Sequence, residues 1–134
     1  YFKVMAFRST LNLGGKEYDV LDCNYSLKRD VDSKGRPSSN IYGGRISVRV
    51  ESTEDTTILE TMVNQFKPFN GSIVFKKGDE EGKMKELTFE NAYIIEFAEG
   101  IDIVGTAPMS ISITISAQII KIGGAEYEEN WPKA

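Results

Sequence analysis

The chain has 134 residues, of which 40% are hydrophobic and 27% are charged, and this composition is typical of a single soluble globular domain. Its 20 acidic and 16 basic residues give a formal charge of −4 and are interspersed, so no basic patch favours a nucleic acid as partner. The absence of histidine removes the usual general base, and the single cysteine cannot form an internal disulfide.

The N-terminal residues carry no pattern of a secretory signal, and no apolar run approaches the roughly 18–20 residues of a membrane span. We expect residues 1–4 to be an added leader before a natural start at Met5, followed by one domain over residues 5–134. We also expect a cytoplasmic protein that is not inserted in a membrane, and whose export needs a dedicated machine rather than a signal peptide.

A β-hairpin is predicted at the N-terminal end of the domain. Apolar and polar residues alternate before Gly14 and after Gly15, and a pair of glycines suits the positive φ angles of a tight turn. The second strand, over residues 16–29, changes phase between Val20 and Leu21. Such a change predicts a β-bulge, which lets a sheet bend towards a barrel.

A long polar loop over residues 30–44 leads into a strand that alternates from Arg45 to Glu51. Connections in compact domains have a median length of about 4–6 residues, and longer ones are usually functional or disordered. The loop begins like a calcium-binding loop, but Lys34 stands where an oxygen ligand belongs and Ile41 where a glutamate belongs. We therefore interpret it as a functional loop without a calcium site.

One helix is predicted after this strand. Residues 52–55 combine hydroxyl and acidic side chains, which is typical of a helix start, and Pro68 ends the pattern. The apolar residues between them follow one stripe that we expect to pack on a sheet: Ile58, Leu59, Met62, Val63 and Phe66.

The C-terminal half predicts further strands over residues 72–76 and 83–90, a bend at Asn91 and Ala92, and an irregular loop over residues 100–108. The last strand has the clearest alternation. Its predicted inward face is Met109, Ile111, Ile113, Ile115, Ala117 and Ile119, and its polar face is Ser110, Ser112, Thr114, Ser116 and Gln118. An uncharged Ser/Thr face can contact another chain, line a water-filled channel or simply face solvent.

These elements predict a mainly β fold, in which two packed antiparallel sheets form a β-barrel with one α-helix at its side. The sequence shows no nucleophile–base pair, no cluster of metal ligands and no phosphate-binding loop. We therefore predict no enzyme activity, no cofactor and no metal, and we interpret Cys23 as a small buried hydrophobe.

Several short strings, in this order and spacing, resemble the Hcp family (hemolysin-coregulated protein, also called TssD), and in particular its Bacteroidota branch. They are Cys23-Asn24-Tyr25-Ser26-Leu27, Gly35-Arg36-Pro37-Ser38-Ser39, Gly43-Gly44-Arg45-Ile46, Glu51-Ser52-Thr53-Glu54-Asp55-Thr56 and Lys83-Met84-Lys85-Glu86-Leu87. The resemblance implies a tube protein of the type VI secretion system, whose hexameric rings stack inside a contractile sheath. It also implies, as partners, further copies of the chain and the sheath, spike and effector proteins, with export into the medium or a target cell.

Together with this resemblance, the long loop becomes a candidate joint between rings. The candidate contact residues are Asp32, Lys34, Arg36, Pro37, Ser38, Ser39, Tyr42 and Trp131, although Trp131 is equally compatible with a local lid over the core. The polar face of the last strand is a candidate lumen wall or subunit contact, and that strand also offers an edge for pairing across subunits. Two alternatives remain open: the tail-tube protein of a phage or extracellular contractile injection particle, and a monomeric ligand-binding β-barrel of the lipocalin type.

Overall fold

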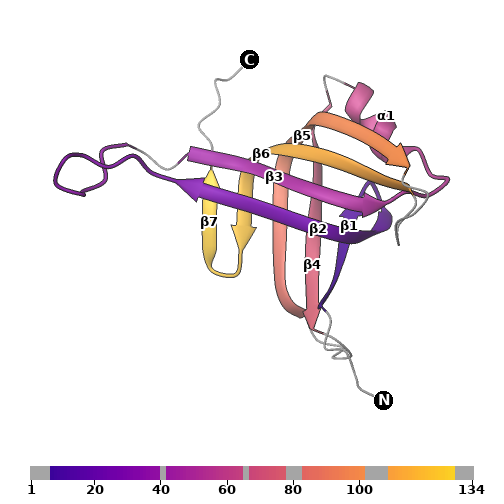
Figure 1. Cartoon of the computed structure of the whole chain (residues 1–134), viewed down its shortest axis with the longest axis horizontal. Helices are drawn as coiled ribbons and strands as arrows, with labels where there is room; N and C mark the ends of the chain where they lie inside the picture. Colours follow the sequence, from indigo (N-terminus) through magenta and orange to yellow (C-terminus); the bar gives the residue numbers. More distant parts are fainter. Residues whose placement is uncertain (1–6, 40–41, 65–66, 78–82, 102–108, 129–134) are drawn as a thin grey trace.

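The computed structural model describes residues 7–39, 42–64, 67–77, 83–101 and 109–128, which form strands and one short helix (Figure 1). In chain order the elements are β1 (Phe7–Leu13), β2 (Lys16–Lys28), β3 (Tyr42–Glu51), α1 (Thr57–Val63), β4 (Phe69–Lys77), β5 (Lys83–Ile101), β6 (Met109–Ile122) and β7 (Ala125–Glu128).

Six antiparallel strands close into a barrel in the order β1-β2-β3-β6-β5-β4, because β3 pairs with β6 as well as with β2. Strand β7 pairs with the C-terminal part of β6, and α1 packs against β5 at one side of the barrel. The predicted mainly β barrel with one side helix is confirmed, and the two expected sheets are parts of one continuous closed sheet.

The barrel is filled by the inward side chains of its alternating strands. Phe89, Leu11 and Ile115 are fully buried, and the ring of Phe69 meets that of Phe89 edge to face at a centroid distance of 5.7 Å. Burial of one such side chain stabilises the fold by about 1.5–3 kcal/mol, so this core is the main source of stability.

The predicted turn, bulge and bend are confirmed. Gly14 and Gly15 have φ angles of 61° and 78° in the β1–β2 turn, and the β2–β3 register shifts between Val20 and Asp22. Asn91 has a φ angle of 50°, and its backbone N–H donates to Asn70 Oδ1 over 3.0 Å. Because the chain resumes its pairing after this bend, β5 is one long strand rather than two.

The helix is shorter than predicted, because residues 52–56 are not helical. The Ser52 N–H donates to the Met109 carbonyl over 3.1 Å, and Asp55 Oδ1 accepts the Thr57 N–H over 2.7 Å, so these groups hold the preceding turn. In a helix of two turns few residues share the face towards β5, because neighbours on one face lie three or four residues apart. The helix therefore buries Ile58 and half-buries Met62.

The outward part of the predicted helix stripe is wrong, since Leu59 is 43% exposed and Val63 is 67% exposed. Phe66, the last member of the stripe, lies outside the described residues.

Two expectations for the last strand are also wrong. Its inward face ends at Ala117, and Ile120 rather than Ile119 is buried, so the alternation changes phase within the strand; Met109 at the other end is exposed. The strand also offers no free edge along its paired length. One edge of β6 pairs with β5, and the other pairs with β3 over residues 110–116 and with β7 over residues 119–122.

Candidate functional site

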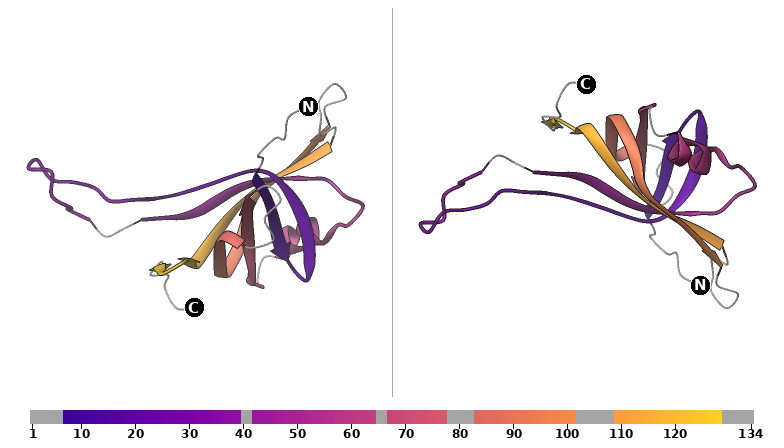
Figure 2. Two further views of the ribbon diagram at one scale, coloured as in Figure 1. Left: turned by 90° about the horizontal axis from the view of Figure 1, so that it is seen from below. Right: turned by 90° about the horizontal axis from the view of Figure 1, so that it is seen from above.

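Strands β2 and β3 continue past the barrel as a two-stranded ribbon that ends in a projecting arm, which we define as residues 28–39 (Figures 1 and 2). Both views of Figure 2 show the arm extending away from the body of the molecule. A bridge between Val31 and Pro37 closes its outer part into a small hairpin. The loop predicted to be functional is therefore the most projecting part of the described chain.

The arm is held by its own hydrogen bonds. Asp32 is their centre: its Oδ1 accepts the N–H groups of Lys34 and Arg36 over 2.9 and 3.0 Å, and its own N–H donates to the Arg36 carbonyl over 2.8 Å. The Arg36 Nε lies 3.5 Å from Asp32 Oδ2, and the Ser38 N–H donates to the Asp30 carbonyl over 2.8 Å. This part of the arm thus has a turn that hydrogen bonds within the arm define.

The structure brings most of the predicted contact residues together in the arm: Asp32, Lys34, Arg36, Pro37, Ser38 and Ser39. Tyr42 begins β3, where its backbone pairs with Lys28, but its side chain is outside the described residues. Trp131 also lies outside the described residues. The prediction that these residues touch another subunit stays a prediction.

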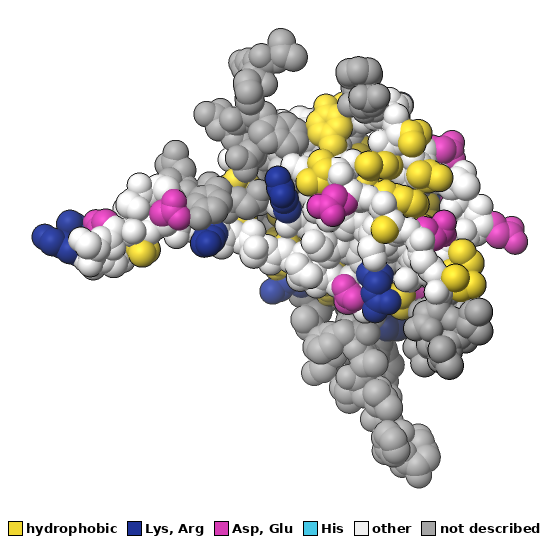
Figure 3. Space-filling model, turned by 45° about the horizontal axis from the view of Figure 1, so that its top comes forward, with side chains coloured by type: hydrophobic (Ala, Val, Ile, Leu, Met, Phe, Trp, Pro, Cys, Tyr) yellow, Lys and Arg dark blue, Asp and Glu magenta, His cyan; other side chains and the backbone are white. Residues whose placement is uncertain are grey.

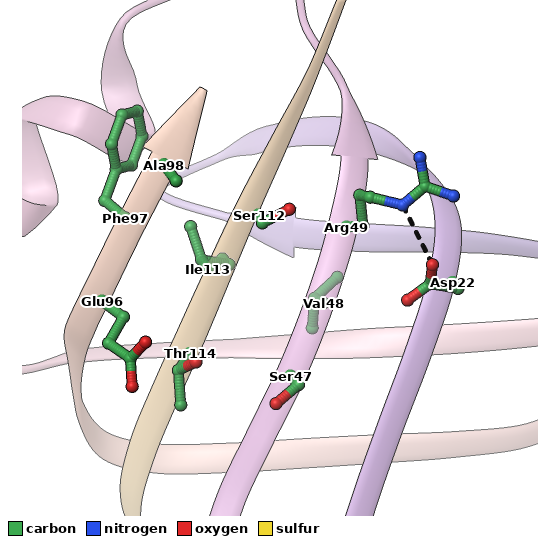
Figure 4. A pocket seen from close by; sticks show the side chains of 10 residues that line it. All are labelled: Asp22, Ser47, Val48, Arg49, Glu96, Phe97, Ala98, Ser112, Ile113 and Thr114. Atoms are coloured by element: carbon green, nitrogen blue, oxygen red, sulfur yellow. Dashed lines mark hydrogen bonds and ion pairs between the residues drawn. The ribbon is translucent and has the colours of Figure 1, made fainter. Parts of the chain in front are cut away.

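Polar side chains cover the outer surface of four neighbouring strands, β2, β3, β6 and β5. We call this surface the polar face. One row across it contains Asn24, Ser47, Thr114 and Glu96. The row beside it contains an ion pair, in which Arg49 Nε donates to Asp22 Oδ2 over 2.9 Å (Figure 4). A shallow hollow of about 250 Å³ lies among these side chains.

The predicted polar residues of the last strand fall into two groups. Ser112, Thr114 and Ser116 lie in the middle of the polar face, while Ser110 pairs with Glu51 at the end of β3. Gln118 instead accepts a hydrogen bond from the Asn91 side chain over 2.9 Å and supports the bend. The sequence predicted the part of the polar face that belongs to β6. It did not predict the part that belongs to β2, although Asp22, Asn24 and Ser26 alternate in the same way.

The polar face has two edges without a partner strand among the described pairings. Beyond Asp19, β2 pairs only with β3, and beyond Ala92, β5 pairs only with β6. Since β2 and β5 bound the face on opposite sides, these edges are the places where another chain can extend the sheet.

The end of the barrel opposite the arm is acidic and partly apolar. We define the acidic end as Glu51, Glu54, Glu99, Ile101 and Met109. These residues are close together because Ile101 pairs with Met109, and because the Ser52 hydroxyl donates to the Glu99 carboxylate.

Beside the acidic end, Lys16 Nζ lies 3.7 Å from Asp55 Oδ2. Hydrogen bonds from the Thr57 hydroxyl and backbone N–H hold the pKa of the Asp55 carboxyl below its usual value, and Lys16 acts in the same direction. Asp55 is thus an ionised structural residue of the turn before α1.

The described residues hold no group of three or more His, Cys, Asp and Glu side chains with the geometry of a metal site. Burial raises the pKa of the Cys23 thiol to about 11, so this thiol is protonated and unreactive near neutral pH. None of the described helices is long and apolar enough to cross a membrane. The arm, the polar face and the acidic end are the candidate contact surfaces among the described residues.

Solved structures with little sequence identity share this architecture. Hcp1 from Salmonella typhimurium superposes with a TM-score of 0.71 at 12% identity, covering 92% of this chain and 92% of that chain. A chain of the anti-feeding prophage baseplate superposes with a TM-score of 0.56 at 9% identity, covering 92% of this chain and 96% of that one. This chain therefore has the same fold as these two structures.

Sequence comparison identifies the family. The family model of hemolysin coregulated protein Hcp (TssD) matches residues 5–132. Hcp1 from Flavobacterium johnsoniae is 38% identical, with a TM-score of 0.87, 91% of this chain covered and 99% of that chain covered. This chain belongs to the Hcp (TssD) family, whose members are structural tube proteins rather than enzymes. No curated protein matches the chain.

Proposed function

We propose that this chain is the tube subunit of a type VI secretion system, which forms hexameric rings that stack into a tube and carry effectors. A contractile sheath expels the tube together with its spike. One observation carries the proposal beyond family membership: the barrel combines a projecting arm at one end with two sheet edges that have no partner strand among the described residues.

The unpaired edges support ring formation. A closed ring needs two different surfaces that fit each other on neighbouring subunits. In the polar face all adjacent strands are antiparallel, so β2 and β5 run in opposite directions. Strand β5 of one copy placed beside β2 of the next would therefore continue the antiparallel pattern around the ring.

The polar face supports a lumen wall. Its middle rows carry small hydroxyl side chains, and the charges are balanced: Asp22 and Glu96 oppose Arg45 and Arg49. A surface with few large apolar groups and no net charge holds a protein cargo weakly, because the interface lacks the buried anchors that supply most binding energy. Effectors would travel in such a tube without being trapped.

The arm supports stacking. Its internal hydrogen bonds fix the turn in advance, so docking on a neighbouring ring costs less conformational entropy than ordering a free loop. Its end also projects beyond the barrel, where it can reach a ring placed above or below (Figure 2).

A second candidate is the tail-tube protein of a phage or of an extracellular contractile injection particle. The superposition on a chain of the anti-feeding prophage baseplate favours it at the level of the fold alone. A lipocalin-like role has no such support, because fully buried side chains such as Phe89 and Ile115 fill the barrel.

The test is secretion by cells that carry the native apparatus. We expect the wild-type chain in the medium only when the sheath is present, and we expect the Arg36→Glu/Ser38→Glu variant to form rings but neither tubes nor secreted protein. Secretion of the wild type without a sheath would contradict the secretion-system role. Normal tubes and normal secretion of the double variant would contradict the joint role of the arm.

A further inference from the structure

The arm is a basic element in an acidic protein. It contains four basic residues and two acidic ones, whereas the whole chain has a formal charge of −4. The arm also carries an apolar group, since Val31 is 63% exposed beside Pro37. Contact with another surface would remove this side chain from water, which is favourable in proportion to the apolar area buried.

The acidic end has the complementary character. Glu51, Glu54 and Glu99 are exposed, and none of them is ion-paired with a basic side chain of the described residues. Beside them Ile101 and Met109 are 65% and 44% exposed. The arm and the acidic end thus carry opposite charges, and each of them also has exposed apolar side chains. Figure 3 shows dark-blue side chains at the free end of the arm and magenta side chains at the opposite end of the molecule.

The two surfaces also have the relative positions that stacking requires. Strand β3 runs from the base of the arm at Tyr42 to the acidic end at Glu51 (Figure 1). A second copy displaced along this strand would place its acidic end where the arm of the first copy projects. From Lys28 to Asp32, before the turn at residues 33–35, the arm extends by about 13 Å, at about 3.3 Å per residue, which carries the turn away from the barrel towards a neighbouring ring.

We propose that the acidic end of a copy in the next ring receives the arm, with Lys34 and Arg36 against Glu51 and Glu54. In the same contact, Val31 covers the exposed side chains of Ile101 and Met109. This inference rests on the proposed stacking function and names the surface that accepts the arm. Because the charged groups are exposed, added salt is expected to weaken the contact. The Debye screening length is about 10 Å at an ionic strength of 0.1 M.

The experiment compares charge reversals on the two surfaces. Sedimentation and negative-stain microscopy measure the fraction of rings in stacks at low and high salt, for Lys34→Glu, for Glu51→Lys and for the double variant. Each single reversal is expected to lower the apparent ring–ring association constant by at least about tenfold, because equivalent weak contacts act together around one joint. The double variant is expected to recover most of the loss. Glu128→Lys, an equal change of charge on β7, is the control and is expected to stack as the wild type does.

The outcomes separate the inference from the proposed function. If Lys34→Glu disrupts stacking but Glu51→Lys does not, or if the double variant shows no recovery, the arm is a joint but its receiving surface is elsewhere, and the inference is wrong. If wild-type rings do not stack at any salt concentration, both the inference and the stacking part of the proposed function are wrong. Sizing of each variant as an intact ring shows that an effect arises between rings rather than within one.

Discussion

Gly71 in β4 occupies a position that no other residue fits. A Cβ atom built there would lie 2.5 Å from the backbone oxygen of Asn12 in β1 and 2.7 Å from the ring of Phe89 in β5. Phe89 is fully buried, and Asn12 belongs to a strand that pairs with β2 and β4 on either side, so neither neighbour can move freely. Overpacking of this kind typically costs about 1–3 kcal/mol.

The substitution Gly71→Ala is therefore expected to lower the free energy of unfolding by about 2 kcal/mol. The unfolding entropy is about 2.1 cal/mol/K per residue, so a loss of about 2 kcal/mol in the free energy of unfolding lowers the Tm of a chain of this length by about 7 °C. The assay is thermal and urea unfolding at one fixed protein concentration, because self-association raises the apparent stability. Gly124→Ala, whose Cβ would meet no atom within 4 Å, is the matched control and should leave Tm almost unchanged. Equal Tm values for Gly71→Ala and wild type would refute the packing argument.

Three further predictions concern single side chains. Asp55→Ala is expected to be less stable than the wild type at neutral pH. This difference should shrink as the pH falls below 3.8, because the pKa of Asp55 is lowered in the folded state and its contribution disappears when it is protonated; a constant difference down to pH 2 would contradict this. Iodoacetamide at pH 8 is expected to label Cys23 about 100-fold more slowly in the folded chain than in the denatured chain, and equal rates would contradict the raised pKa. Asp32→Ala is expected to speed hydrogen exchange at the amides of Lys34 and Arg36 while shifting Tm by less than about 2 °C; unchanged exchange would show that Asp32 does not hold the turn.

The sequence predicted the barrel because its strongest signals are local. The glycine pair at the first turn, the phase change after Val20 and the bend at Asn91 each correspond to a backbone feature of the structure. Such features depend on a few neighbouring residues, and alternation then determines which side chains enter the core.

The helix and the edges could not be predicted in the same way, because they depend on tertiary contacts. A capping pattern at residues 52–55 is equally compatible with a turn, and here the Ser52 N–H is used by the Met109 carbonyl instead of starting a helix. Likewise, strand pairing decides which edge is free. Only the pairing of β3 with β6 shows that, among the described strands, the edges without a partner belong to β2 and β5.

The candidate surfaces were partly predictable. The length and polarity of the loop predicted a functional role, but its projection from the barrel and its Asp32-centred turn are visible only in the structure. The acidic end was not found from the sequence at all. Its members come from β3, the following turn, β5 and β6, and no sequence spacing connects them.

The proposed function requires that this barrel is the subunit of a ring. Native mass spectrometry of the purified full chain, together with class averages from negative-stain microscopy, tests it most directly. We expect one dominant species of six chains, with six-fold rings around an open centre. A single chain of 15.0 kDa as the dominant species at high protein concentration would contradict it.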